Sequence, residues 1–253
     1  MKQKVLVIGD LHGRHELATK AYDTFLKGKY DKAIFLGDYA DSHDRPDADI
    51  LRTFNIVLTM KKNHPEQVEL LVGNHDEPYF HLDVPRQLLS KGFRMTLHRS
   101  LSHVLAPNIK EFSYAYGIKN YLFTHAGVSH KWFFKHFDLL SMWATRMDMD
   151  LLDVEDLHII LDNIRLTGDK YILFEIGPER GGYDSDAGGP MWCDRDELLN
   201  FGPLQGLNQV VGHTSQQFIS RIHTFEGNKK YKDTSVTFTD CLSHREQFLT
   251  LEI

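Results

Sequence analysis

Carboxylate and imidazole side chains recur in this sequence directly after short apolar runs that end in glycine. The first of these places holds Asp10 and His12, which follow the apolar residues 5–8 and Gly9. A carboxylate and an imidazole two residues apart on a turn can converge on one divalent cation. Taken alone, they could equally be a turn-capping aspartate and a surface histidine.

The same arrangement recurs four more times along the chain. Its members all lie within a few residues of a glycine and offer oxygen or nitrogen donors: Asp38 and Asp41, Asn74 and His75, His125, and His213. The preference of polar residues and glycine for turns explains one such place but explains five poorly. Donors of this kind, without thiolates, suit Mn, Fe, Zn or Mg. Because the set exceeds what one ion needs, we expect two ions that share a carboxylate, about 3.5–4 Å apart.

The elements that must position these residues are predicted to be strands followed by helices. Apolar runs at residues 5–8, 32–36 and 68–72 predict buried strands, and residues 14–29 and 48–63 have apolar side chains at helical spacing. Successive strand–turn–helix units imply parallel strands with right-handed crossovers. Their carboxyl ends then share one edge of the sheet, where open α/β sheets bind ligands.

The second half of the chain is less regular. Residues 120–123 and 209–211 predict two more strands, residues 150–165 predict a helix, and alternating apolar residues from Phe218 onward predict antiparallel strands. The Gly- and Pro-rich stretch 177–190 is expected to be a functional or disordered loop.

Two further stretches allow only a coarse interpretation. Residues 82–89 suggest a helix interrupted by Pro85. The aromatic residues Trp132, Phe133, Phe134 and Phe137 are interpreted as core packing rather than a stacking surface.

Length and charge restrict the class of protein. The 253 residues, without a recognisable linker, predict a single domain over residues 1–253. The 29 basic and 35 acidic residues give a net charge of −6, which argues against a general nucleic-acid or membrane-surface binder. Two cysteines suit a reducing compartment, and the apolar run at the N-terminus is too short for a signal peptide, so we expect a cytoplasmic protein.

The order and wording of the five motifs resemble the calcineurin-like metallophosphoesterases. The motifs are Gly-Asp-Leu-His-Gly, Gly-Asp-Tyr-Ala-Asp, Gly-Asn-His-Asp, Thr-His-Ala-Gly and Gly-His-Thr, and they span residues 9–214. The nearest branch is that of the phosphoprotein phosphatases, with its phage and bacterial protein phosphatases and the symmetrical dinucleoside tetraphosphatases. The resemblance implies an α/β fold in which a two-layer β-sandwich is flanked by helices on both sides.

The resemblance also implies a role for each motif residue. The first ion would be bound by Asp10 and His12, and the Asp38 carboxylate would bridge the two ions. The second ion would be bound by Asn74, His125 and His213. His75 would be the general acid for the leaving oxygen, held by Asp41. A carboxylate on one ring nitrogen favours imidazolium, so that the other nitrogen can donate a proton. A hydroxide bridging the ions would attack phosphorus in line.

Two departures from the branch concern the phosphate-binding side. An Arg follows the position of Asp41 in the branch, whereas Ser42 follows it here, and Asp76 stands where Glu is usual. The phosphate clamp must then come from another cation, and the candidates are Arg45, Arg180 and Arg195.

We therefore expect an enzyme that hydrolyses phosphomonoesters with two divalent metal ions, manganese before iron, zinc or magnesium. A phosphorylated Ser/Thr protein is one expected substrate class. The alternatives are a dinucleoside polyphosphate or nucleotide pyrophosphohydrolase and, from another class, an inactive protein-binding scaffold. A scaffold is disfavoured because every ligand position and the Asp41–His75 pair are filled.

Overall fold

The computed structural model describes residues 2–81, 88–183, 185–223 and 234–253. The chain forms two compact units, which are described separately. Unit 1 comprises residues 1–113 and 241–253, and unit 2 comprises residues 114–240. The prediction that both belong to one domain stays a prediction.

Unit 1 contains a five-stranded sheet in the order β10-β1-β2-β3-β4. Its strands are β1 (Lys4–Ile8), β2 (Lys32–Phe35), β3 (Val68–Leu71), β4 (Phe112–Ser113) and β10 (Leu249–Glu252). The first four strands run parallel, and β10 is antiparallel to β1. Parallel neighbours bring the carboxyl ends of β1, β2 and β3 to one edge, as the sequence predicts.

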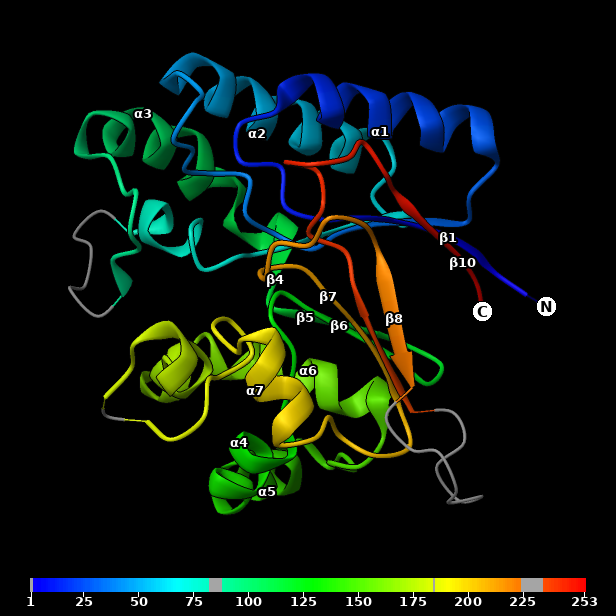
Figure 1. The fold of residues 1–253 in the computed structure, drawn as a ribbon, viewed down its shortest axis with the longest axis vertical. Helices are drawn as coiled ribbons and strands as arrows, with labels where there is room; N and C mark the ends of the chain where they lie inside the picture. Colours follow the sequence, from blue (N-terminus) through cyan, green and yellow to red (C-terminus); the bar gives the residue numbers. More distant parts are fainter. Residues whose placement is uncertain (1, 82–87, 184, 224–233) are drawn as a thin grey trace. The chain divides into compact units, whose positions relative to one another are not determined.

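Helices connect the parallel strands of unit 1. They are α1 (His15–Gly28), α2 (Asp47–Asn63) and α3 (Met95–Leu105), with the 3₁₀ turns η1 (Glu77–Phe80) and η3 (Ala106–Glu111). Figure 1 shows α1 and α2 side by side along the sheet. Each turns an apolar stripe to the core, with Ala21 and Phe25 buried in α1 and Phe54 and Val57 in α2.

Unit 2 contains a second five-stranded sheet in the order β5-β6-β7-β9-β8. Its strands are β5 (Ala115–Ile118), β6 (Tyr121–Thr124), β7 (Asn208–Val211), β8 (Ser220–His223) and β9 (Ser235–Phe238). The central strands β6, β7 and β9 are parallel, while β5 and β8 are antiparallel to their neighbours. The carboxyl ends of β6 and β7 therefore lie together.

The helical segments of unit 2 are α4 (His130–Lys135), α5 (Phe137–Met147), α6 (Val154–Ile164), η4 (Gly168–Phe174), η5 (Pro178–Arg180) and α7 (Arg195–Asn200). In Figure 1, α6 lies along β5 and buries Leu157, Ile160 and Leu161. It begins at Val154, later than predicted, because the Asp153 side chain accepts a hydrogen bond from the Glu155 N–H and caps the first turn.

The predicted α/β class is confirmed, and one packing prediction is wrong in part. Of the four aromatic residues interpreted as core, Trp132 and Phe133 are buried. Phe134 is 55% exposed and Phe137 39% exposed, with their rings stacked on each other at 5.8 Å. Of the helix suggested at residues 82–89, residues 82–87 lie outside the described residues.

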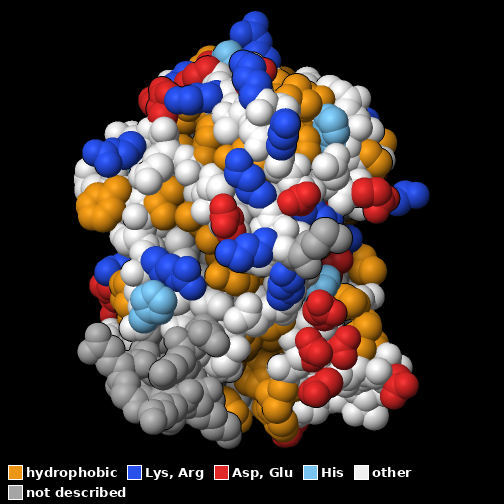
Figure 2. Space-filling model, turned by 90° about the vertical axis from the view of Figure 1, so that its right-hand side faces the viewer, with side chains coloured by type: hydrophobic (Ala, Val, Ile, Leu, Met, Phe, Trp, Pro, Cys, Tyr) orange, Lys and Arg blue, Asp and Glu red, His pale blue; other side chains and the backbone are white. Residues whose placement is uncertain are grey.

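The surface carries both signs of charge. On the face shown in Figure 2, Lys and Arg side chains are interspersed with Asp and Glu. None of the helices in the described part of the chain is long and apolar enough to cross a membrane.

Candidate active site

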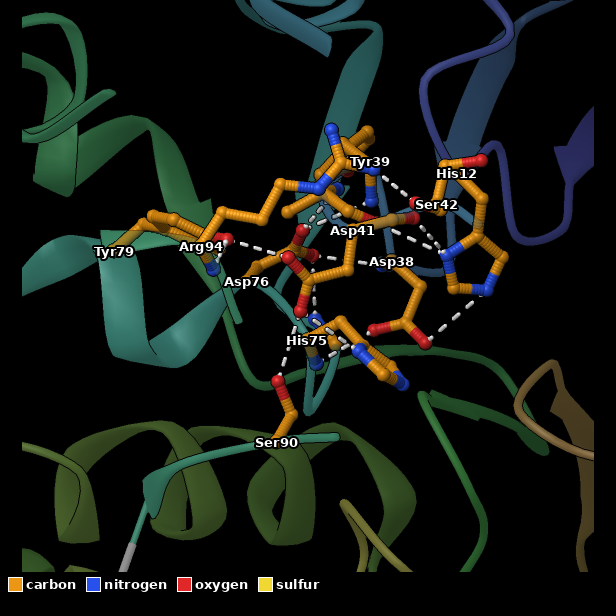
Figure 3. Close-up of polar contacts among 12 residues, drawn as sticks. His12, Asp38, Tyr39, Asp41, Ser42, His75, Asp76, Tyr79, Ser90 and Arg94 are labelled. Atoms are coloured by element: carbon orange, nitrogen blue, oxygen red, sulfur yellow. Dashed lines mark hydrogen bonds and ion pairs between the residues drawn. The ribbon is translucent and has the colours of Figure 1, made fainter. Parts of the chain in front are cut away.

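Asp10, His12 and Asp38 of unit 1 come together at the carboxyl ends of β1 and β2. Each offers a ligand atom, and these atoms lie within 4.8 Å of one another. His12 Nδ1 faces two carbonyl oxygens, those of Ala40 at 3.0 Å and Asp41 at 2.8 Å. Because carbonyl oxygens only accept hydrogen bonds, Nδ1 carries the proton and Nε2 keeps its lone pair. That nitrogen lies 3.7 Å from Asp38 Oδ2 (Figure 3), so His12 has the tautomer that a metal ligand needs.

The turns that hold these residues are tied to each other through the backbone. The N–H groups of Leu11 and His12 both donate to the Asp38 carbonyl, at 3.0 and 2.8 Å. The third turn, after β3, approaches so closely that a Cβ on Gly73 would lie 2.0 Å from Asp38 Oδ1. Only glycine permits this approach, which lets His75 N donate to Asp38 Oδ1 at 2.9 Å.

Several of these polar residues have left-handed backbone conformations. The φ angles are 44° at His12, 54° at Asp38 and 50° at Asp41 in unit 1, and 65° at His213 in unit 2. Non-glycine residues adopt this region rarely, at a cost on the order of 1–3 kcal/mol each. Such conformations persist only where the surrounding structure holds them, and they concentrate at functional sites.

Hydrogen bonds to the Asp76 carboxylate stabilise much of this backbone. The carboxylate is fully buried and accepts four backbone hydrogen bonds: from Asp38 at 2.7 Å, Tyr39 at 2.9 Å, Ala40 at 2.8 Å and Gly73 at 2.9 Å (Figure 3). Hydrogen bonds to an ionised acceptor are roughly twice as strong as neutral ones. Asp76 therefore joins the turn after β2 to the turn after β3 and fixes the direction of the Asp38 side chain.

His75 and Asp41 form the expected pair. His75 Nδ1 lies 3.0 Å from Asp41 Oδ2. A carboxylate only accepts, so Nδ1 donates and Nε2 is left for other chemistry. The same carboxylate accepts hydrogen bonds from Ser90 Oγ at 2.9 Å and from the Tyr79 hydroxyl at 2.5 Å (Figure 3). Asp41 is thus fixed by three side chains and has little freedom to turn away from His75.

The electrostatics favour a protonated His75. Burial alone would lower its pKa, but the carboxylates of Asp38, Asp41 and Asp76 outweigh burial and raise the pKa from 6.5 to about 9. Burial and the Asp41 carboxylate also raise the pKa of Tyr79, which keeps its hydroxyl a donor. Bound divalent cations would bring the His75 value down again, because they offset the charge of Asp38.

Unit 2 places two predicted ligands at neighbouring strand ends. His125 follows β6 and His213 follows β7, and His213 Nδ1 lies 3.2 Å from His125 Nε2. The Gly212 N–H donates to the His125 carbonyl at 2.8 Å, which ties the two ends together. The Trp192 ring lies edge-on to His213 at 5.7 Å. Two imidazoles so arranged can both present a ring nitrogen to one cation.

The three arginines that the sequence offers for phosphate differ in their surroundings. In unit 1, the Arg45 guanidinium forms an ion pair with Glu16 at 2.6 Å. In unit 2, Arg180 pairs with Asp194 at 2.7 Å and donates to Thr214 Oγ1 at 2.9 Å.

Arg195 also lies beside the turn that carries His213. Its backbone N–H donates to Thr214 Oγ1 at 3.1 Å, and its guanidinium pairs with Asp196 at 3.1 Å. The Gly-rich stretch before it is held by the buried Glu197, which accepts from the N–H groups of Glu179 and Gly188 at 2.9 and 2.8 Å. In its described residues this stretch is a supported loop next to α7.

Sequence reasoning missed several supporting residues. The role of Asp76 could have been suspected, because it directly follows Asn74 and His75 in the third motif. Ser90 and Arg94 gave no signal. Arg94 donates to the carbonyl oxygens of Ser42 and Arg45 and to Asp47 Oδ1, so it fixes the loop after Asp41.

Comparisons with known proteins agree with this chemistry. The profile of the family described as calcineurin-like phosphoesterase matches residues 3–217. Serine/threonine-protein phosphatase 7 of Arabidopsis thaliana is 38% identical over 76 residues. That match covers 30% of this chain and only 17% of the plant protein.

The solved structures to which this chain is similar are more distant in sequence. A metallophosphoesterase from Sphaerobacter thermophilus is 12% identical with a TM-score of 0.42, covering 94% of this chain and 76% of its own. A dimetal phosphatase from Danio rerio is 13% identical with a TM-score of 0.42, covering 99% and 92%. A serine/threonine phosphatase from Saccharomyces cerevisiae is 17% identical with a TM-score of 0.45, covering 93% and 67%. Because the family profile spans most of its length, the chain belongs to the calcineurin-like phosphoesterase family.

Proposed function

We propose that this protein hydrolyses phosphate monoesters, with phosphorylated Ser/Thr proteins as a candidate substrate class, and that it does so with two divalent ions. The observation that carries the proposal is that two imidazoles of unit 1 have their ring protons fixed by hydrogen bonds in complementary ways. His12 has its unprotonated nitrogen toward Asp38, and His75 has its protonated nitrogen on Asp41. One is ready to bind a cation and the other to deliver a proton.

The proposed metal ligands have only oxygen and nitrogen donors: Asp10, His12, Asp38, Asn74, His125 and His213. Such donors suit manganese, iron, zinc or magnesium, and manganese is the ion that we propose first. When bound, two such ions would activate a water and polarise the phosphoryl group. Asp38 has the bridging role in this proposal, and a net negative donor set would draw divalent cations in preference to monovalent ones.

His75 would protonate the leaving oxygen from Nε2. Asp41 keeps the ring in one orientation and stabilises its charged form, while Ser90 and Tyr79 keep Asp41 in place. Of the arginines predicted from the sequence, Arg180 and Arg195 remain proposals for substrate binding. Arg45 is the weakest of the three, because Glu16 engages its guanidinium.

The main alternative is cleavage of a pyrophosphate bond in a nucleotide or dinucleoside polyphosphate. The same metals and acid would serve this reaction, so only a comparison of substrates distinguishes pyrophosphate cleavage from monoester hydrolysis. A panel of phosphopeptides, nucleotides and dinucleoside polyphosphates, tested with metal-reconstituted protein, does this. Preference for phosphopeptides supports the proposal, and preference for dinucleoside polyphosphates supports the alternative.

With only two cysteines, both buried, we propose a reducing compartment such as the cytoplasm.

Replacement of the bridging carboxylate tests the metal site directly. Asp38→Asn should abolish turnover and reduce the metal content of the purified protein, because an amide is a weaker ligand and carries no charge. Asp23→Asn, at an exposed position of α1, is the matched control and should keep both. An Asp38→Asn protein that retains two tightly bound ions by elemental analysis would exclude the bridging role.

A further inference from the structure

A cavity of about 360 Å³ opens beside the proposed metal and acid residues, and unit 1 alone forms it. Its lining includes His12 and His75, the cations Arg14 and Lys91, and five further polar residues: Asp41, Ser42, His43, Asp44 and Ser243. Among the described residues that line it, no Phe, Tyr or Trp occurs. The lining thus offers no aromatic surface for a stacked base, and any anionic group that binds here would do so through Arg14 and Lys91.

Arg14 is the most constrained cation of this cavity. Its side chain is only 14% exposed, and its backbone N–H donates to the Leu11 carbonyl at 2.9 Å, so it is fixed two residues from His12. By contrast, Lys91 lies on an exposed turn. A charge that is mostly buried costs free energy unless it is paired, so the partners of Arg14 matter.

Those partners leave most of its binding capacity unused. Among the described residues, the guanidinium donates one hydrogen bond, to the Leu11 carbonyl at 3.3 Å, and lies 3.9 Å from Asp44. The Asp44 carboxylate is 65% exposed and already accepts from Ser42 Oγ at 2.7 Å. A guanidinium has five N–H donors in a planar fork that fits two oxygens of one anion. Arg14 is thus a mostly buried cation whose ion pair with the exposed Asp44 is long, and it faces a cavity that His12 and His75 also line.

We infer that Arg14 binds the phosphoryl group of the substrate and that it makes the enzyme selective for phosphate monoesters over diesters. The inference rests on the proposed function and names the substrate class of the same site. A monoester has three non-bridging oxygens, so oxygens remain for a guanidinium beside those that the metals contact. A diester has two and carries one charge less, so Arg14 has less to bind.

The position of Ser42 is consistent with this role. In the related branch the residue after Asp41 is an arginine, and here the short Ser42 side chain lines the cavity instead. Ser42 bonds to Asp44 and leaves the cavity open to Arg14, which enters from the start of α1. The cation thus comes from the turn after β1 rather than from the turn after β2.

The test compares two substrates that share a leaving group, p-nitrophenyl phosphate and bis(p-nitrophenyl) phosphate, on metal-reconstituted full-length protein. Arg14→Ala should lower kcat/KM for the monoester by about 10²-fold, the usual effect of losing one charged transition-state donor, and should lower the diester value by no more than a few-fold. Arg14→Lys should lie between, because it keeps the charge but not the fork. Arg52→Ala, on the exposed face of α2, removes the same charge outside the cavity and should match wild type.

A binding measurement keeps the inference testable without turnover. Calorimetric titration of the metal-loaded protein with inorganic phosphate should show affinity at least about 10-fold weaker in Arg14→Ala than in wild type or Arg52→Ala, with metal content unchanged. Equal losses on both esters, or unchanged phosphate affinity, would overturn the role of Arg14. Wild-type protein that cleaves neither ester would instead contradict the proposed function, and the phosphate titration would still decide about Arg14.

Discussion

At the scale of single residues, the sequence identified which side chains could do the chemistry but not the states in which they are held. Motif spacing is enough to name His12 and His75, because each follows a strand end and a glycine. It cannot say which ring nitrogen carries the proton, since that depends on carbonyl and carboxylate oxygens from residues 40 and 41, about 30 positions away. Arg14 was missed for the same reason. Its burial and its cavity arise only when the turns are folded together.

The acid role that we propose for His75 leads to a prediction about leaving groups. His75→Asn should leave metal content unchanged and lower the rate by roughly 10²–10⁴, the usual contribution of a positioned acid. The loss should be largest for alkyl phosphates such as phosphoserine peptides and smallest for p-nitrophenyl phosphate, whose leaving group needs no proton. Steady-state rates on both substrates check this, with His103→Asn on the exposed side of α3 as control. The same loss on both substrates would count against an acid.

At the scale of elements, the strands and helices of the first strand–turn–helix units were predicted well because their apolar patterns are local, whereas β4, β5, α3, α4, α5 and α7 were not predicted. β1, β2, β3, α1 and α2 all begin and end within two residues of the expected positions. The turns between them were harder, because their conformations come from hydrogen bonds across the sheet edge. Asp76 shows this. One carboxylate after β3 fixes three consecutive N–H groups after β2, and although its place in the third motif is visible in the sequence, these partners are not.

Replacing one carboxylate oxygen of Asp76 by an amide nitrogen tests whether Asp76 supports the turns after β2 and β3. In Asp76→Asn, an NH₂ group replaces an oxygen that accepts two backbone N–H groups, so donors face a donor in a fully buried place. We expect a loss of roughly 2–4 kcal/mol in the free energy of unfolding. We also expect weaker metal binding, because Asp38 is no longer held. Urea unfolding and metal titration measure both effects. Asp23→Asn on α1 controls for the lost charge. An Asp76→Asn protein as stable as this control would contradict the role of Asp76 in joining the turns after β2 and β3.

At the scale of the whole molecule, the parallel arrangement of β1, β2 and β3 could be predicted, but the pairing of the strands in the second half of the chain could not. The apolar runs before His125 and His213 predict strands correctly, but periodicity says nothing about which strands become neighbours. Here β6 and β7 belong to a second sheet, with β9 parallel to β7 although β8 lies between them in the sequence. The partial exposure of the aromatic group after β6 has the same origin. Its hydrophobicity was visible, but the neighbours that cover only Trp132 and Phe133 were not.

Stability of the molecule should fall in mild acid, and one partly buried histidine outside the metal motifs contributes. His158 of α6 packs against Tyr116 of β5, with ring centroids 5.7 Å apart. Burial lowers its pKa from 6.5 to about 4, despite the opposing effect of the Asp156 carboxylate. In the unfolded chain His158 therefore takes up a proton near pH 6.5, whereas in the folded chain it does so only near pH 4. The stabilisation is complete above pH 6.5 and is lost as the pH falls toward 4, at most about 3 kcal/mol in all.

His158→Phe keeps an aromatic ring of similar size against Tyr116 and removes the titration. Between pH 7 and pH 5, we expect wild type to lose up to about 2 kcal/mol more unfolding free energy than His158→Phe, because 1.36 kcal/mol accompanies each pH unit below the unfolded pKa. Urea unfolding at both pH values, with a chelator present so that metal release does not contribute, measures this difference. If both proteins lose stability in parallel as the pH is lowered, His158 is not buried in its neutral form, and the acid sensitivity belongs to other groups.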